Sequence, residues 1–252
     1  MSLPTFGFVT VHRRPFADGI AREADWMATS AATGRAVAHL WQGVPGFIVP
    51  RRYTLLPAWP SRPADVAVQV RASGGGLVPQ GPGLWNLSLA WPVKSAMPDG
   101  IEAIYTGMCE QLAAAFARLG LASSTQAVEG SFCDGKYNLA VGGRKLVGTA
   151  QAWRRVEGRP VVMAHAVIVV GADPQAITDA CNGYETALST ATRYRAEALT
   201  SIAREVTGAT DIEARTLTVL AEQFARAIPP RIFMERQEHG PARVRDGPAG
   251  PG

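Results

Sequence analysis

The chain has 252 residues, of which 47% are hydrophobic and 18% are charged, so it can bury the core of one large domain. Its formal net charge of +4 is small, and no run of Lys or Arg resembles a nucleic-acid-binding surface. No stretch is apolar over the length of a membrane span, and residues 1–10 lack the pattern of a signal peptide. We therefore expect a cytoplasmic protein with neither nucleic-acid nor membrane partners.

The first part of the chain predicts one helix and two strands. Residues 18–29 form the helix, with Asp18 as its cap, and residues 36–42 form the first strand. Residues 43–63 carry many prolines and aromatic residues and predict a loop-rich crossing. Apolar and polar residues then alternate over residues 66–71, which predicts the second strand.

Three consecutive glycines, residues 74–76, lie between Arg71 and another alternating strand over residues 87–91. Each glycine loses extra backbone entropy on folding, so the triplet predicts backbone that approaches a ligand closely. The open N–H groups of this turn, together with the Arg71 guanidinium, can bind a carboxylate or a phosphate. The alternative is the flexible tip of a hairpin.

The rest of the chain predicts helices on either side of a run of antiparallel strands. Helices are expected over residues 99–119, from residue 173 onward and over 211–228, and strands over residues 137–141, 144–153 and 160–170. These elements do not alternate one for one, which favours an α+β fold with a mixed, largely antiparallel sheet packed with helices.

Lys145 is the first candidate for catalysis. It follows the turn Gly142–Gly143 at the start of a strand, in a chain that has 25 basic residues but only three lysines. If its strand and the glycine triplet share one site, its ammonium can neutralise charge that develops on an acyl oxygen or a phosphate. The alternative is a solvated lysine on the surface.

Cys133 is the second candidate. It is expected in an exposed loop near Asp134 and Lys136, where a thiolate is favoured and can act as a nucleophile. The other two cysteines, Cys109 and Cys181, fall in predicted helices, and the irregular spacing of the three indicates reduced thiols without a metal site. An inert loop thiol is the alternative for Cys133.

Two motifs in this chain resemble the lipoate–protein ligase A and octanoyltransferase family, of which biotin protein ligases are distant relatives. The first motif is Arg followed by Ser/Thr-Gly-Gly-Gly and a strand, matched by Arg71, Ser73, Gly74, Gly75 and Gly76. The second is Gly-Arg-Lys-x-x-Gly-Ser/Thr-Ala, matched by Gly143, Arg144, Lys145, Gly148, Thr149 and Ala150. The resemblance covers roughly residues 18–170.

The resemblance implies a class II synthetase-like catalytic module over residues 1–205. A helical extension over residues 206–234 and a flexible tail over residues 235–252 would follow it. It also implies attachment of a lipoyl or octanoyl group to a lysine of a lipoyl-carrier domain.

In this resemblance Lys145 contacts the acyl carbonyl or an acyl-phosphate, while Arg71 and the glycine triplet line the acyl and nucleotide pocket. Gln80 stands where many members have a histidine, and Asn138 is placed to orient a phosphate or to satisfy the strand edge. His165 falls where relatives have a strand histidine, with a hydrogen-bonded core histidine as the alternative.

Three functions follow from the resemblance. The first is a ligase that uses ATP and Mg²⁺ to make an acyl-adenylate, although Val70 replaces a second arginine that such ligases often carry. The second is an ATP-free octanoyltransferase that takes its acyl group from acyl-carrier protein through a Cys133 thioester. The third is a non-catalytic module of the same fold that binds a small molecule.

Overall fold

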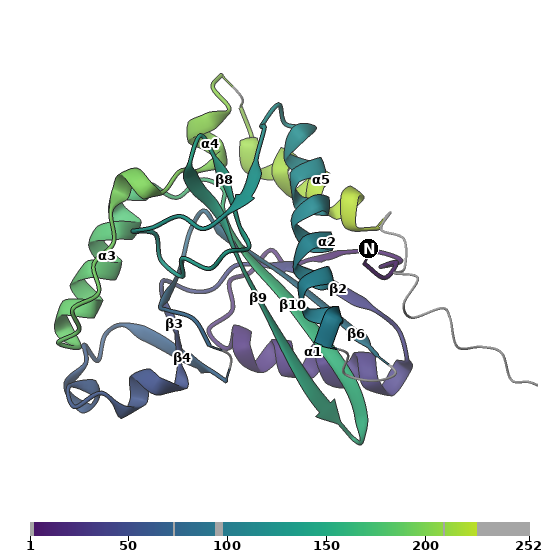
Figure 1. The fold of residues 1–252 in the computed structure, drawn as a ribbon, viewed down its shortest axis with the longest axis horizontal. Coiled ribbons are helices and arrows are strands. Elements are labelled where there is room, and N and C mark those ends of the chain that lie inside the picture. Colours follow the sequence, from purple (N-terminus) through teal and green to yellow (C-terminus); the bar gives the residue numbers. More distant parts are fainter. Residues whose placement is uncertain (1–2, 73, 94–97, 209, 226–252) are drawn as a thin grey trace, which may run out of the picture.

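The computed structural model describes residues 3–72, 74–93, 98–208 and 210–225. Its centre is a seven-stranded sheet in which β1 pairs with β2 in parallel and all other pairs are antiparallel (Figure 1). The order across the sheet is β1 (Thr10–Val11), β2 (Val37–Trp41), β6 (Leu84–Pro92), β10 (Arg159–Val169), β9 (Arg144–Val156), β8 (Asn138–Val141) and β7 (Ser124–Gln126). The predicted α+β fold with a mixed, largely antiparallel sheet is confirmed.

A second, three-stranded sheet has the order β4 (Ala67–Arg71), β3 (Gly46–Pro50) and β5 (Val78–Gln80). The prediction that residues 43–63 are a loop-rich crossing is wrong in part, because β3 lies within them and pairs in parallel with β4. Two short 3₁₀ turns, Arg51–Leu55 and Trp59–Ser61, follow it. The hairpin alternative for the glycine triplet is also wrong, since the strands on its two sides, β4 and β5, do not pair with each other and β3 lies between them in the small sheet.

Two groups of helices cover the two faces of the large sheet (Figure 1). The first face is covered by α2 (Pro98–Ala117) and α5 (Ile212–Ala225), and the second by α1 (Gly19–Thr33) with the small sheet. The remaining helices are α3 (Pro174–Ala187), the 3₁₀ turn Ala196–Ala198 and α4 (Ile202–Glu205). Among the described residues, no helix combines the length and the apolar character that crossing a membrane requires.

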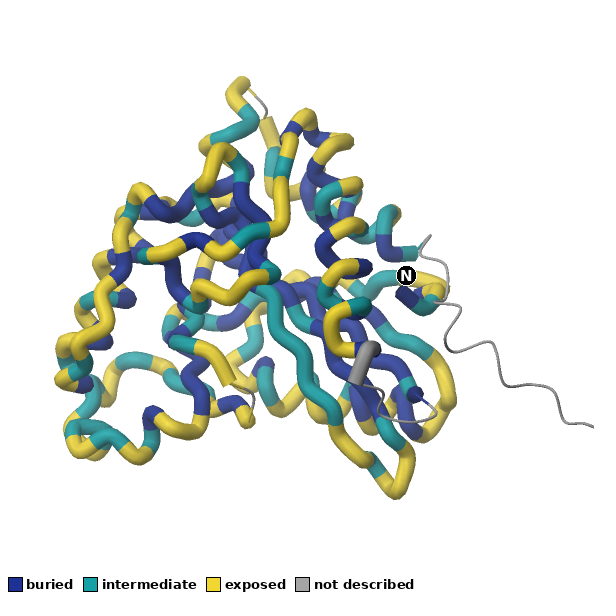
Figure 2. The backbone as a smooth tube through the Cα atoms, viewed as in Figure 1, coloured by how far each residue is buried: buried dark blue, intermediate teal, exposed yellow. Residues whose placement is uncertain are grey.

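Successive side chains of the central strands point to opposite faces of the large sheet, so the two faces differ in polarity. Leu87 and Leu89 of β6 join Met108 and Phe116 of α2 in the main apolar core. Asn86, Ser88 and Ala90 of β6 are buried on the opposite side of the strand, toward α1. Buried residues follow the strands through the middle of the molecule, and exposed ones lie on the hairpin tip and the outer helix surfaces (Figure 2). The polar residues of the sheet thus collect on the α1 face.

The last described helix is part of the main core. Leu220 and Phe224 of α5 have no exposed surface and belong to the same cluster as the apolar residues of α2. The end of the helix predicted to residue 228 and the tail predicted to be flexible lie outside the described residues.

Two helix starts test the predicted caps. The Asp173 carboxylate accepts a hydrogen bond from Ala176 N at 3.0 Å at the start of α3. Asp18 is the N-cap residue of α1, as predicted, but its side chain makes no capping hydrogen bond. Instead the side chain of Gln69 in β4 accepts a bond from Ile20 N at 2.9 Å. This contact fixes α1 to the small sheet.

Candidate functional site

A β-bulge in β9 determines where the side chain of Lys145 points. Leu139 pairs with Val147 and Ala140 pairs with Lys145, so Leu146 is an extra residue on β9. One extra residue shifts the alternation by one, which turns Lys145 to the same face as Gly148. A Cβ added to Gly148 would lie 3.0 Å from Lys145 Nζ, which places the ammonium directly beside that glycine.

Lys145 is fully buried, so the alternative of a solvated surface lysine is wrong. Its ammonium donates to the carbonyl oxygen of Cys133 at 2.7 Å and to that of Phe132, and it lies 4.5 Å from the centre of the Phe132 ring. Burial lowers the pKa of Lys145 to about 8, and the nearby Cys133 and Asp134 act in the opposite direction. A positive charge is therefore held directly under the loop that carries Cys133.

Cys133 is half-buried, and its backbone has a φ of 53°, which is uncommon for a residue with a side chain. Its sulfur accepts a hydrogen bond from Gly76 N at 3.4 Å. Its carbonyl also accepts from Asn138 Nδ2 at 3.2 Å, beside the bond from Lys145. Cys133 thus lies between the glycine triplet and Lys145, with an N–H group bonded to its sulfur and an ammonium bonded to its carbonyl oxygen.

Arg71 holds the glycine triplet in place. Its guanidinium donates to the carbonyl oxygens of Gly74 at 2.9 Å, Gly76 at 2.6 Å and Ile48 at 3.1 Å. Only 9% of Arg71 is exposed, and burial lowers the pKa of its guanidinium. Arg71 therefore orders the loop through three carbonyl groups. Ser73, the remaining residue of the first motif, lies outside the described residues.

Gly75 is the point at which the triplet approaches Cys133 most closely. Its φ is 95°, and a Cβ added there would lie 2.8 Å from Cys133 Sγ and 3.0 Å from Arg71 Nη2. No L side chain fits this position without moving the sulfur or the arginine. Glycine is therefore required at residue 75 for two reasons: its positive φ, and the close approach of the Cys133 sulfur and the Arg71 guanidinium.

We expect Gly75→Ala to reduce activity about 10²-fold, because a displacement of the sulfur of order 1 Å has effects of this size. Gly143→Ala is the matched control. Gly143 also has a positive φ, 77°, but no atom lies within 4 Å of its added Cβ. Both variants carry the backbone strain, and only the first pushes on Cys133. Equal losses of activity in both variants would show that backbone strain alone is responsible.

A deep cavity of about 790 Å³, including its opening, extends from Cys133 between the large sheet and α1. Small residues of β9 at alternating positions, Gly148, Ala150 and Ala152, leave room along its floor. Apolar side chains supply much of the remaining lining, among them Ile20, Met27, Ile48, Val78, Met163 and Val167, and Gln151 and Arg154 also line it. The cavity has the form and lining of a site for an extended apolar group.

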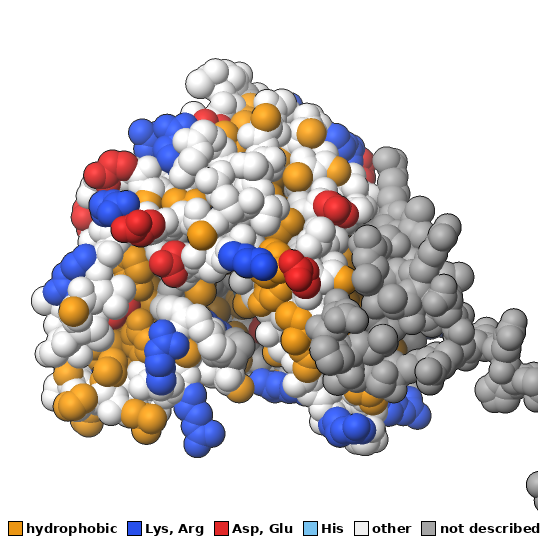
Figure 3. All heavy atoms as spheres, viewed as in Figure 1, with side chains coloured by type: hydrophobic (Ala, Val, Ile, Leu, Met, Phe, Trp, Pro, Cys, Tyr) orange, Lys and Arg blue, Asp and Glu red, His pale blue; other side chains and the backbone are white. Residues whose placement is uncertain are grey.

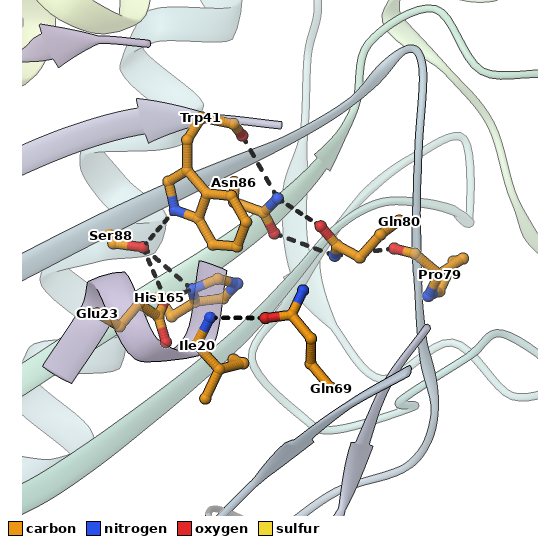
Figure 4. A network of polar contacts seen from close by, with 9 residues as sticks. All are labelled: Ile20, Glu23, Trp41, Gln69, Pro79, Gln80, Asn86, Ser88 and His165. Atoms are coloured by element: carbon orange, nitrogen blue, oxygen red, sulfur yellow. Dashed lines mark hydrogen bonds and ion pairs between the residues drawn. The ribbon is translucent and has the colours of Figure 1, made fainter. Parts of the chain in front are cut away.

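A half-buried carboxylate and a histidine lie among these apolar residues (Figure 4). Glu23 of α1 accepts a bond from Ser88 Oγ at 2.7 Å and lies 2.5 Å from His165 Nδ1. Burial raises the pKa of Glu23, but His165 and the bonds from His165 and Ser88 outweigh it, so the pKa is lowered overall. His165 therefore lines the cavity, as expected of a site residue, and it is also hydrogen-bonded, as expected of a core histidine.

A second, wider cavity opens on the other side of Cys133. It is lined by the glycine triplet and Cys133, by basic and acidic residues at its rim, and by three tyrosines, Tyr53, Tyr105 and Tyr194. Thr149 and Ala150 line both cavities. The face in Figure 3 is hollowed near its middle, and acidic and basic side chains are interspersed around the hollow. Cys133 thus lies where a deep apolar cavity meets an open mouth.

The structure brings most of the candidate residues to this junction. Gln80 is the exception, because its amide pairs with that of Asn86 at 2.8 Å and it lines neither cavity. Asn138 contacts the Cys133 carbonyl and no open space, being 1% exposed. Sequence patterns did not indicate Glu23 or Tyr194, since each is a single polar residue in an ordinary helix or loop.

The model of the lipoyl protein ligase A/B catalytic domain family matches residues 25–225. An uncharacterised protein of Cupriavidus necator is 39% identical over 218 residues, covering 79% of this chain and 86% of that protein. An octanoyl-[GcvH]:protein N-octanoyltransferase of Kyrpidia tusciae is 32% identical over 229 residues, covering 86% and 78%. The structure of a putative lipoate protein ligase from T. acidophilum has the same fold, with a TM-score of 0.61 and 16% identity over 88% of this chain and 85% of that one.

Proposed function

Because the chain belongs to the lipoyl protein ligase A/B catalytic domain family, we propose that it moves an octanoyl group between lysines of two carrier proteins through a thioester on Cys133. It is an acyl-transfer enzyme of this family. The single observation that carries the proposal is the position of Cys133. Its sulfur lies at the end of an apolar cavity, with the Gly76 N–H bonded to it and the Lys145 ammonium bonded to its carbonyl.

The proposed reaction has two steps that balance. In the first, the Cys133 thiolate attacks the carbonyl carbon of an octanoyl-lysine amide, a C–S bond forms, and the C–N bond breaks as the lysine amine leaves with a proton. In the second, the amine of the acceptor lysine attacks the thioester, a C–N bond forms, the C–S bond breaks as the thiolate leaves, and the nitrogen releases one proton, which balances the proton taken up in the first step. One amide replaces another, so the overall free-energy change is small and no ATP is required.

The names of relatives support ATP-free octanoyl transfer over ATP-dependent ligation. The Kyrpidia tusciae protein is named as an N-octanoyltransferase whose donor is octanoylated GcvH. We therefore propose a carrier protein of that kind as donor and a lipoyl-carrier domain as acceptor, in place of the acyl-carrier protein expected from the sequence. The ATP-dependent ligase reaction, with its acyl-adenylate and Mg²⁺, is the competing candidate that the following experiment separates.

The test supplies three octanoyl donors to the purified chain: an octanoylated carrier protein, octanoyl-acyl-carrier protein, and octanoate with ATP and Mg²⁺. Intact mass is measured before and after hydroxylamine, which cleaves thioesters. We expect one octanoyl adduct from the octanoylated carrier protein without ATP, removed by hydroxylamine. Acylation of the acceptor only with ATP, and no adduct on the enzyme, would establish the ligase reaction and overturn the proposal.

The deep cavity is the proposed site of the octanoyl chain. Gly148 and Ala152 are about 13 Å apart along β9, at roughly 3.3 Å per residue. An octanoyl chain has seven C–C bonds of about 1.5 Å and spans roughly 9 Å when extended. Measured from Gly148, its last carbon would therefore end about 4 Å short of Ala152, at contact distance from that residue, which faces Met163 across β9 and β10.

We expect Ala152→Phe to shorten this cavity and to shift the preference toward shorter chains. Excluding two methylene groups removes about 1.6 kcal/mol of burial, at about 0.8 kcal/mol each, which is about a tenfold loss of octanoyl relative to hexanoyl transfer. Butanoyl transfer serves as the internal control, because that chain ends before residue 152. A uniform loss for all three chains would place the acyl group elsewhere.

A further inference from the structure

Glu185 is a buried carboxylate that the reaction described above does not use. It lies on α3 with no exposed surface. Its Oε1 accepts hydrogen bonds from Tyr53 OH at 2.7 Å and from Tyr194 OH at 2.8 Å, and its Oε2 accepts one from Thr190 at 2.6 Å. Among the described residues, no Lys, Arg or His forms an ion pair with it. A buried carboxylate without a cation is costly, so the fold retains it at the expense of stability.

Tyr194 connects this carboxylate to the open mouth beside Cys133. Tyr194 lines the second cavity together with Cys133 and Gly76. A Cβ added to Gly76 would lie 3.8 Å from Tyr194 OH, 3.6 Å from Cys133 N and 3.8 Å from Cys133 Cα. The phenol oxygen and the Cys133 backbone therefore flank the same small space, which is open because residue 76 is glycine.

The backbone of Tyr194 is held firmly in this position. Its N–H donates to Asn182 Oδ1 at 2.8 Å, and its carbonyl accepts from Asn182 Nδ2 at 3.0 Å. Asn182 and Glu185 both lie on α3. One helix therefore fixes the backbone of Tyr194 and also the direction of its hydroxyl.

The proposed acyl transfer needs a group that handles protons at this mouth. A lysine amine has a pKa of about 10.4 in water, so the acceptor arrives as an ammonium and must lose a proton before it can attack. The departing lysine in the first step must gain one. Lys145 is unsuited to this task, because its ammonium is buried against the carbonyls of Phe132 and Cys133.

We propose, on the basis of the proposed function, that the Tyr194 hydroxyl relays a proton between the substrate lysine and Glu185. The acceptor ammonium gives a proton to the Tyr194 oxygen while the Tyr194 proton passes to Glu185, and the free amine then attacks the thioester. In the first step of the next cycle the same proton returns from Glu185 through Tyr194 to the leaving amine. When the amine attacks, its nitrogen loses a second proton, which goes to solvent. The departed donor lysine takes up one proton from solvent as it becomes an ammonium, so the protons balance over the cycle.

The electrostatics of the site support this direction of transfer. An ammonium and a carboxylate that are both removed from water become neutral together when one proton moves between them. Burial and Glu185 raise the pKa of Tyr194, so this phenol passes a proton on and does not itself ionise. Tyr53, Tyr184 and Cys181 also face Glu185, and burial raises the pKa of each of them. Arg52 lies over the Tyr53 ring, 5.6 Å from its centre.

Tyr194→Phe tests the relay, with Tyr53→Phe as the matched control. Both variants remove one hydroxyl from the same Glu185 oxygen, but the Tyr194 hydroxyl is among the three atoms nearest to a Cβ added at Gly76, whereas the Tyr53 hydroxyl is not. The octanoyl-enzyme is isolated first, and its reaction with the acceptor domain is followed between pH 7 and pH 9. Its reaction with hydroxylamine is followed in parallel, because hydroxylamine is a neutral nucleophile at pH 7.

At pH 7 we expect Tyr194→Phe to slow transfer to the acceptor about 10²-fold, the lower end of general-base effects. Relative to the wild type, in which Lys145 titrates over the same range, its rate should rise about tenfold per pH unit, as the fraction of free amine does below its pKa of about 10.4. Its reaction with hydroxylamine should match that of the wild type. Tyr53→Phe should show a much smaller loss and no such steep rise with pH.

Two results would overturn the relay without touching the thioester mechanism. One is a constant ratio between wild type and Tyr194→Phe across the pH range, and the other is an equal loss with hydroxylamine. Failure of the wild type to form an octanoyl-enzyme at all would instead contradict the proposed function. Glu185→Gln gives an independent check, since it keeps acceptor geometry but cannot take up the proton, and we expect it to reproduce the pH dependence of Tyr194→Phe.

Discussion

Replacing Cys133 by alanine is expected to lower octanoyl transfer at least ~10³-fold and to abolish the hydroxylamine-labile adduct, because the variant has no atom that can carry the acyl group. Cys133 is half-buried at the junction of two cavities, and the side-chain change is small. The fold should therefore be preserved. The measurement is intact mass together with the rate of acceptor acylation.

Cys109→Ala is the control for this experiment. Cys109 is a thiol on α2 that is 2% exposed, and burial raises its pKa to about 11, so it stays protonated at neutral pH. We expect this variant to form the adduct as the wild type does. Full transfer activity in Cys133→Ala would contradict the account directly, because no thioester route would then be available.

Replacing Lys145 by methionine is expected to lower transfer about 10²- to 10³-fold, the effect of removing one group that stabilises charge in a reaction. Methionine fills a similar apolar volume but cannot donate to the carbonyl oxygens of Cys133 and Phe132. The loop that carries Cys133 then loses both its anchor and the nearby positive charge. The measurement is the rate of octanoyl transfer to the acceptor domain.

The pH dependence of the wild type follows from the same residue. Burial lowers the pKa of Lys145 to about 8, so the ammonium is present below that pH and is lost as the pH rises through it. Activity should therefore decline above about pH 8. Lys145→Met lacks the titrating group and should lack this decline.

Lys136→Met is the matched control for Lys145. Lys136 is three residues from Cys133 in the chain, but it is exposed and lies 3.6 Å from the Glu102 carboxylate. We expect a change of less than about threefold, in line with the small contribution of exposed ion pairs. Thermal unfolding of both variants is recorded alongside. Equal losses in the two lysine variants would show that general surface charge, and not the buried ammonium, supports the reaction.

Much of this arrangement could be predicted from the sequence. The alternating strands and amphipathic helices indicated an α+β fold, and two short motifs indicated the family. Those motifs also marked Lys145 and the glycine triplet, because a lysine after a glycine turn and three adjacent glycines are unusual in sequence. Cys133 was a candidate from its loop setting and from the family resemblance.

The rest depends on features that only the three-dimensional structure provides. Whether Lys145 faces the cavity depends on the bulge at Leu146, which shifts the register of one strand pair and leaves no pattern in the sequence. Arg71 was expected to bind a ligand, whereas it donates to three backbone carbonyls of its surroundings. Glu23 and Glu185 reach the site from helices distant in sequence, so periodicity could not indicate them.

The account depends most on the claim that the acyl group passes through Cys133. The most direct test is to isolate the octanoyl-enzyme, mix it rapidly with acceptor domain in the absence of ATP, and follow both the enzyme adduct and the acylated acceptor by mass. We predict that the adduct disappears as acylated acceptor appears, at a rate no slower than steady-state turnover. An adduct that transfers more slowly than the overall reaction, or that maps to a residue other than Cys133, would contradict the account.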